Sequence, residues 1–105
     1  MVAYVVGQMS IHNADLYREY TAITPTTVKR HGGRFLTRGS EVSALEGGPY
    51  PKRLVIIEFP DTACAKAWFN DPEYQAAAEY RRASSTSIVL LQEGPADATN
   101  PDPNI

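Results

Sequence analysis

The chain has 105 residues and a mass of 11.5 kDa, which fits one compact domain and excludes a multidomain enzyme. Ten Lys and Arg residues against twelve Asp and Glu residues leave no basic surplus for nucleic acid, and no apolar run approaches the roughly 20 residues that cross a bilayer. We therefore expect neither nucleic acid nor a membrane as a partner. The first residues carry no secretory signal pattern and the single cysteine cannot form an internal disulfide, so we expect a cytoplasmic protein.

The chain begins with a predicted strand and a predicted helix. Val2 to Ile11 is rich in β-branched and aromatic residues, which is typical of a strand. Asn13 can cap a helix over about residues 14 to 31, where apolar residues follow helical spacing and a Gly-Gly pair supplies the stop. Pro25 lies inside this helix and removes a backbone donor, so we expect a kink or a break near Thr24.

A hairpin is predicted next. Arg34 to Glu46 has the composition of a second strand, with a bulge expected at Gly39 because an isolated glycine in a strand often marks one. The turn cluster GGPYP at residues 47 to 51 follows, and Arg53 to Phe59, dense in Val and Ile, is the third strand.

The second half of the chain repeats the helix-strand order. Thr62 to Phe69 is helical in pattern, and Asp71 can cap a restarted helix from Pro72 to about Ala83. Ile88 to Gln92 is a fourth, nearly all-apolar strand. Residues 95 to 105, rich in Pro and Asp, have no core-forming pattern and are predicted to be a C-terminal tail to a single domain of residues 1 to 94.

The predicted order of elements is β-α-β-β-α-β. Two right-handed crossovers joined by a hairpin give a four-stranded antiparallel sheet in the spatial order 4-1-3-2, with both helices on one face. The other face would carry Tyr4, Val6 and the run Ile88 to Leu91, which are too apolar to meet water as a large patch. We therefore expect a homodimer formed through this face; a monomer with an unusually apolar sheet is the alternative.

A set of short segments spread over residues 3 to 94 is more specific in combination than any one of them. They are Tyr4-Val5-Val6-Gly7-Gln8, Tyr17 with Tyr20, His31-Gly32-Gly33-Arg34-Phe35, Arg38-Gly39, Leu45-Glu46-Gly47, Arg53-Leu54-Val55-Ile56-Ile57-Glu58-Phe59-Pro60, Ala67-Trp68-Phe69 and Pro72-Glu73-Tyr74-Gln75. Together they resemble domain-of-unknown-function family 1330. The resemblance implies the dimeric α/β-barrel superfamily, in which two ferredoxin-like sheets meet across a dimer. It implies no settled reaction, although that superfamily includes cofactor-free monooxygenases, haem-degrading proteins and muconolactone-isomerase-like enzymes.

Glu58 is the main catalytic candidate. It lies in the apolar run Leu54 to Phe59 on a predicted central strand, and a buried carboxylate must be paired or have its pKa raised. If the hairpin turn centres on Pro49, Glu58 falls near Arg38, so we expect an Arg38–Glu58 ion pair. Two interpretations stay open: a structural pair that fixes the strand register or the dimer interface, and a functional carboxylate in a pocket.

Three tyrosines and a second arginine are further ligand candidates. Tyr17, Tyr20 and Tyr74 would lie at helix-sheet contacts, with hydroxyl groups able to point into a cleft. Arg53 falls opposite Glu46 by the same turn arithmetic, which predicts an exposed ion pair and leaves Arg53 as a ligand contact if that pair does not form.

Other chemistry has no support in the motifs. No two His, Cys or carboxylate residues have metal-ligand spacing, and neither a GxGxxG motif nor a P-loop is present, so we expect no metal and no cofactor. Cys64 is followed by Trp68 one helical turn later, on a packed face, which disfavours a nucleophile. Arg81 and Arg82 close the second helical region, where cations offset the helix dipole, and that role is sufficient for them.

The sequence thus predicts an α+β, ferredoxin-like homodimer that binds a small, partly apolar molecule in a pocket near Glu58 and Arg38. A cofactor-free oxygenase or isomerase, with Glu58 as general base, is one alternative. A non-catalytic interaction module, in which the dimer surface is the whole function, is the other.

Overall fold

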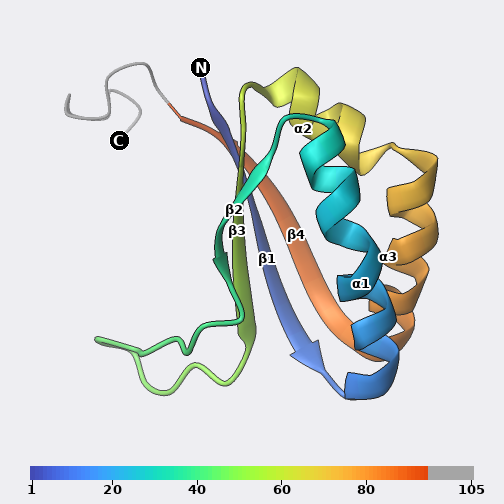
Figure 1. The fold of residues 1–105 in the computed structure, drawn as a ribbon. Coiled ribbons are helices and arrows are strands. Elements are labelled where there is room, and N and C mark those ends of the chain that lie inside the picture. Colours follow the sequence, from blue (N-terminus) through green and yellow to red (C-terminus); the bar gives the residue numbers. More distant parts are fainter. Residues whose placement is uncertain (95–105) are drawn as a thin grey trace.

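The structure is a computed structural model, and it describes residues 1 to 94. A four-stranded antiparallel sheet in the order β2-β3-β1-β4 is covered on one face by three helices (Figure 1). The elements are β1 (Ala3–Ile11), α1 (Ala14–Arg30), β2 (Arg34–Arg38), β3 (Arg53–Phe59), α2 (Thr62–Phe69), α3 (Pro72–Ser84) and β4 (Ser85–Glu93). The predicted sheet order and ferredoxin-like fold are confirmed. The tail predicted for residues 95 to 105 lies outside the described residues.

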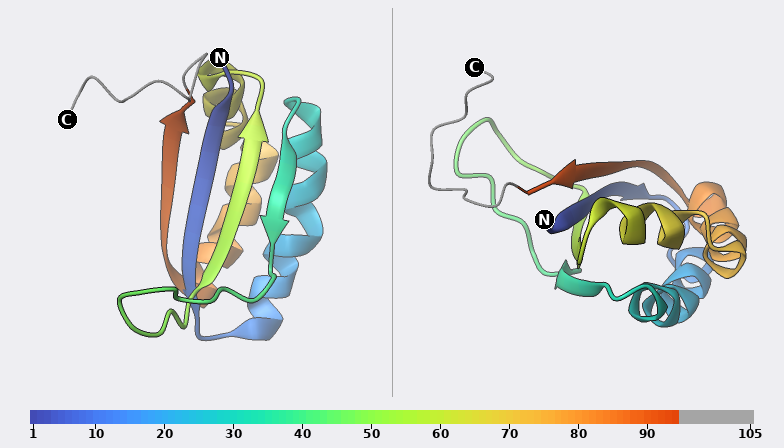
Figure 2. Two further views of the ribbon diagram at one scale, coloured as in Figure 1. Left: turned by 90° about the vertical axis from the view of Figure 1, so that its left-hand side faces the viewer. Right: turned by 90° about the horizontal axis from the view of Figure 1, so that it is seen from above.

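Alternation along β1 gives the sheet two different faces. Val5, Gly7 and Met9 point toward the helices and are buried, whereas Tyr4 and Val6 point to the other face and are partly exposed. Strand β1 lies in the middle of the sheet, between β3 and β4, and the left view of Figure 2 looks onto the face opposite the helices. We call this side the open face, since no helix of residues 1 to 94 covers it.

An aromatic cluster joins the helices to the sheet. Trp68 of α2 is almost fully buried, with its ring centroid 5.4 Å from that of Phe59 on β3 and 4.1 Å from that of Tyr74 on α3. Its indole N–H donates a hydrogen bond of 3.1 Å to the hydroxyl of Thr27 on α1. Burying the indole without that partner would leave a polar group unsatisfied, so Thr27 fixes where Trp68 can lie.

Helix α1 runs unbroken through Pro25, so the break expected near Thr24 is absent. The proline removes one backbone hydrogen bond, to the carbonyl of Thr21, from a helix of 17 residues. One residue earlier, the hydroxyl of Thr24 donates a bond of 2.7 Å to the carbonyl of Tyr20. At its start, the Asn13 side chain accepts a hydrogen bond from the backbone N–H of Leu16, as the sequence predicts for a cap.

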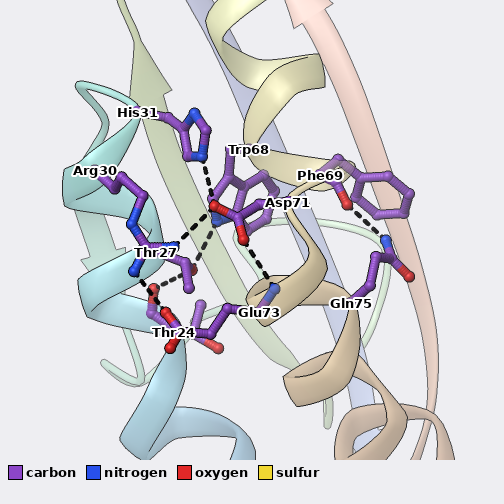
Figure 3. Close-up of polar contacts among 9 residues, drawn as sticks. All are labelled: Thr24, Thr27, Arg30, His31, Trp68, Phe69, Asp71, Glu73 and Gln75. Atoms are coloured by element: carbon purple, nitrogen blue, oxygen red, sulfur yellow. Dashed lines mark hydrogen bonds and ion pairs between the residues drawn. The ribbon is translucent and has the colours of Figure 1, made fainter.

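An ion cluster joins the end of α1 to the start of α3 (Figure 3). The Asp71 carboxylate accepts a hydrogen bond from Arg30 at 2.9 Å, lies 2.8 Å from His31 Nε2, and caps α3 by accepting from the backbone N–H of Glu73. The second guanidinium nitrogen of Arg30 donates to the Glu73 carboxylate at 2.6 Å. The hydrogen bonds from His31 and Arg30 hold the pKa of Asp71 well below its usual range.

The hairpin differs most from the sequence prediction. Strand β2 ends at Arg38 instead of Glu46, and residues 39 to 52 form a loop. The bulge lies between Phe35 and Thr37, so the bulge predicted at Gly39 is wrong. The extra residue in the bulge brings Phe35 and Arg38 onto the helix side of the sheet, although they are three positions apart.

Candidate functional site

A cavity lies between the helix side of the sheet and helices α1 and α3. The space in which a water-sized atom can be centred is about 40 Å³, within a wider depression of about 490 Å³ that includes solvent at its mouth. Apolar side chains form much of its wall, such as Val55 on β3 and Val89 on β4. Its charged and phenolic groups are Arg38, Arg53, Arg81, Tyr17, Tyr20 and Tyr74.

Part of the cavity exists because residue 7, in its wall, is a glycine without a side chain. Gly7 lies in the middle of β1 on the helix side, in ordinary negative-φ backbone. A Cβ at this position would meet the Met9 sulfur at 3.2 Å and the Met9 methyl at 3.7 Å, with no other neighbour of the described residues within 4 Å. A larger residue here would therefore fill the cavity with little strain elsewhere.

Two of the arginines enter the cavity from β2 and β3. The guanidinium carbon of Arg38 lies 4.7 Å from the ring centroid of Phe35, and that of Arg53 lies 5.6 Å from the ring centroid of Tyr17. Gly39, with φ of 82°, makes room for Arg53, because a Cβ there would lie 2.7 Å from an Arg53 nitrogen. Both cations thus stack on aromatic rings.

The third arginine, Arg81 of α3, is the most buried, with 5% of its surface exposed. One of its terminal nitrogens donates to the Ser87 hydroxyl at 2.6 Å, and its guanidinium carbon lies 5.7 Å from the Tyr20 ring centroid. The Nε atoms of Arg81 and Arg53 are both buried without a hydrogen-bond partner among residues 1 to 94. The cavity wall in this part of the chain contains no Asp or Glu, so these cations have no carboxylate partner there.

The tyrosines supply neutral hydroxyl groups. The hydroxyls of Tyr20 and Tyr74 lie 2.9 Å apart and share a hydrogen bond. Burial raises the pKa of Tyr20 far above its usual value, and burial also raises the pKa of Tyr17, against the opposing effect of the Arg53 charge. Both phenols therefore stay protonated near neutral pH and can donate or accept hydrogen bonds, but neither serves as a base.

Glu58 lies away from this cavity, on the open face. Its carboxylate accepts from Arg34 Nε at 3.3 Å, and Arg34 is also its cross-strand neighbour. The predicted Arg38–Glu58 ion pair is wrong, because the long loop and the bulge change the strand register, so that Arg34 lies opposite Glu58 and Arg38 lies opposite Val55. The structure therefore does not bring Glu58 together with the other candidates.

The predicted pair between Arg53 and Glu46 is also absent. Glu46 lies in the loop after β2, whereas Arg53 opens β3 opposite Met9 and lines the cavity. For Arg81 the sequence predicts only a helix-end role, whereas the structure places it in the cavity wall. The signal was its spacing, since Arg81 follows Tyr74 and Ala77 at intervals of seven and four on the buried stripe of α3.

Five of the six predicted site residues line this cavity: Arg38, Tyr17, Tyr20, Tyr74 and Arg53. Within residues 1 to 94, no group of three His, Cys, Asp or Glu side chains is placed to hold a metal ion. Among the helices of the same residues, none has the length and apolar character needed to cross a membrane.

Residues 2 to 95, nearly the whole chain, match the family DUF1330, described as a domain of unknown function. The chain belongs to this family. No curated protein matches it.

Solved structures share the fold at low sequence identity. A protein of unknown function from Rhodopseudomonas palustris is 18% identical, with a TM-score of 0.75 over 91% of this chain and 84% of its own. A dimeric ferredoxin-like protein of unknown function from Jannaschia sp. CCS1 is 19% identical, with a TM-score of 0.70 over 90% of this chain and 100% of its own. SnoaB, a cofactor-independent oxygenase from Streptomyces nogalater, is 18% identical, with a TM-score of 0.65 over 94% of this chain and 98% of its own.

Proposed function

We propose that this DUF1330 protein is a homodimer that binds a small, partly apolar molecule in the cavity between the sheet and helices α1 and α3. The observation that carries the proposal is the composition of the cavity wall, which combines apolar side chains with three arginines and three tyrosine hydroxyls. Such a concave, mostly apolar site with a few converging polar groups is typical of a small-molecule site. The ligand would contact Arg38, Arg53 and the hydroxyls of Tyr17, Tyr20 and Tyr74.

The open face supports the dimer. Ile88 and Leu90 of β4 are 50% and 51% exposed, and Val6 and Ile56 beside them are partly exposed. A continuous apolar surface of this kind on a sheet is typical of an interface, and a second copy would cover it with two-fold symmetry. The dimeric protein from Jannaschia shares the fold.

A cofactor-free oxygenase or isomerase is the second candidate, favoured by the fold shared with SnoaB. In that candidate Glu58 would be the general base. Because Glu58 lies on the open face beside Arg34, its substrate would have to bind at that face, in contact with the dimer interface, and not in the cavity. The cavity therefore favours the binding function over this reaction.

The test is an amide-resolved NMR titration of the full chain with propionamide, benzamide, propionate and benzoate. We expect at least one of these molecules to shift the amides of Gly7, Val55 and Val89, which line the cavity. Gly7→Val should abolish the shifts and Gly7→Ala should weaken them, since each added carbon occupies cavity space. No shift with any molecule, with the protein folded and dimeric by native mass spectrometry, would leave an interaction module as the better explanation.

A further inference from the structure

One cation of the cavity, Arg81, differs from an ordinary surface arginine because it is buried without a counter-charge among residues 1 to 94. Arg81 is 95% buried, and a charge at that depth is strongly destabilising unless it is paired. Its contacts among residues 1 to 94 are one neutral hydroxyl, Ser87, and the face of the Tyr20 ring. Neither contact neutralises the charge.

A second cation, Arg53, lines the same cavity as Arg81. The rings of Tyr17 and Tyr20 are 5.4 Å apart, with the Arg53 guanidinium near the first ring and the Arg81 guanidinium near the second. Each guanidinium has a buried Nε without a partner among the described residues. Two N–H donors thus lie unpaired in the wall of one mostly apolar cavity, and each belongs to a positively charged group.

We propose that Arg81, assisted by the charge of Arg53, binds the carboxylate of a small monocarboxylic acid, while the apolar body of the acid lies against the valines of the cavity wall. This proposal rests on the proposed function, in which the cavity holds a small molecule. It goes further than the proposed function because it names the head group of the ligand, a carboxylate, and the arginine that binds it.

Size and charge favour a carboxylate over a larger or more highly charged anion. A cavity needs roughly 10 to 15 Å³ of water-centred space for one water molecule, so about 40 Å³ holds a head group of a few heavy atoms. A carboxylate matches the planar fork of a guanidinium with two oxygens. Inorganic phosphate carries more charge into the same apolar wall, and its desolvation penalty is correspondingly greater.

The experiment compares each acid with its amide, which has the same shape without the charge. NMR or calorimetric titration of the full chain should give a Kd for propionate and benzoate about tenfold or more below that of propionamide and benzamide, with inorganic phosphate weaker than either acid. Arg81→Met should weaken benzoate binding by about 30-fold or more, because it removes one partner of a buried charge pair. Arg82→Met, one position along α3 on an exposed side chain bonded to Glu79 and Gln75, is the matched control and should leave the Kd unchanged.

Thermal unfolding separates a binding role from a structural one. If Arg81 exists for the ligand, the ligand-free Arg81→Met variant should melt at the same temperature as the unsubstituted protein or higher, since an apolar side chain replaces a buried unpaired charge. A melting temperature several degrees lower, with benzoate affinity unchanged, would overturn the proposal and make Arg81 a structural residue. Should Arg81→Met fail to fold, Arg53→Met, at a partly exposed position, carries the same affinity test.

The outcomes also separate this proposal from the proposed function. If propionamide and benzamide bind as tightly as the acids, and shift the same backbone amide signals of the cavity, the carboxylate site is refuted. The cavity would then remain a small-molecule site. Phosphate binding more tightly than the acids would likewise refute the monocarboxylate. Absence of binding by every acid and amide would refute both.

Discussion

The molecule has two clusters of cations, and they differ in whether carboxylates neutralise them. At the junction of α1 and α3, Arg30 and His31 are paired with the carboxylates of Asp71 and Glu73 (Figure 3). In the cavity, Arg53 and Arg81 have no carboxylate partner among residues 1 to 94. Compensated charges at a helix junction are what a structural role requires, whereas uncompensated buried charges lower stability unless a ligand completes them. Disrupting the junction should therefore destabilise the protein, and disrupting the cavity should chiefly affect binding.

The largest effect is expected at the junction. Asp71→Ala removes the cap of α3 and leaves Arg30 and His31 without their shared carboxylate, so the melting temperature should fall by on the order of 10 °C. Asp15→Ala, which breaks a largely solvent-exposed pair with Arg18, is the control and should change the melting temperature little. Calorimetry on both variants checks this. If Asp71→Ala and Asp15→Ala melt at the same temperature, the junction cluster does not stabilise the fold.

The contribution of the Asp71 carboxylate should also be visible in the stability of the protein at acidic pH. Because the pKa of Asp71 is lowered on folding from its ordinary value of 3.8, the folded protein keeps it charged where the unfolded chain takes up a proton. Its stabilisation is complete above about pH 4 and is lost as the pH falls below that value toward the folded pKa. Urea unfolding between pH 6 and pH 2.5 should show a steeper loss below pH 4 for the unsubstituted protein than for Asp71→Asn. Parallel curves would contradict the assignment.

A smaller effect is expected from the neutral part of the cavity. Tyr20→Phe removes one hydroxyl of the Tyr20–Tyr74 hydrogen bond and leaves the other buried, which should lower the free energy of unfolding by about 1 to 2 kcal/mol. The double variant with Tyr74→Phe should cost less than the sum of the two single variants, since no orphaned hydroxyl remains. Tyr80→Phe, at a residue that is 38% exposed, is the control. Additive costs in urea unfolding would show that the two hydroxyls are independent.

The contrast between local and non-local signals explains what the sequence could predict. The caps at Asn13 and Asp71 depend on residues three positions away or fewer, and both are present as predicted. The hairpin register depends on where a bulge falls in a strand, which no local pattern fixes. Because the bulge lies between Phe35 and Thr37 and not at Gly39, the partner predicted for Glu58 is wrong. Arg81 was missed because a cation near a helix end has a sufficient explanation in the helix dipole, although its spacing from Tyr74 places it on the buried stripe.

The smallest effect is expected for Glu58, whose pair with Arg34 resembles neither cluster. In a single copy the carboxylate side chain is 24% exposed and that of Arg34, on the edge strand β2, is 71% exposed, so solvent screens their attraction to about 0 to 1 kcal/mol. Glu58→Gln should therefore change the melting temperature by a few degrees at most and leave benzoate affinity unaltered, since the sheet separates this residue from the cavity. Arg34→Gln is the matched variant and should have the same small effect. A loss of ligand binding on Glu58→Gln alone would mean that the ligand contacts the open face, and it would move the functional carboxylate back to the position that the sequence first indicated.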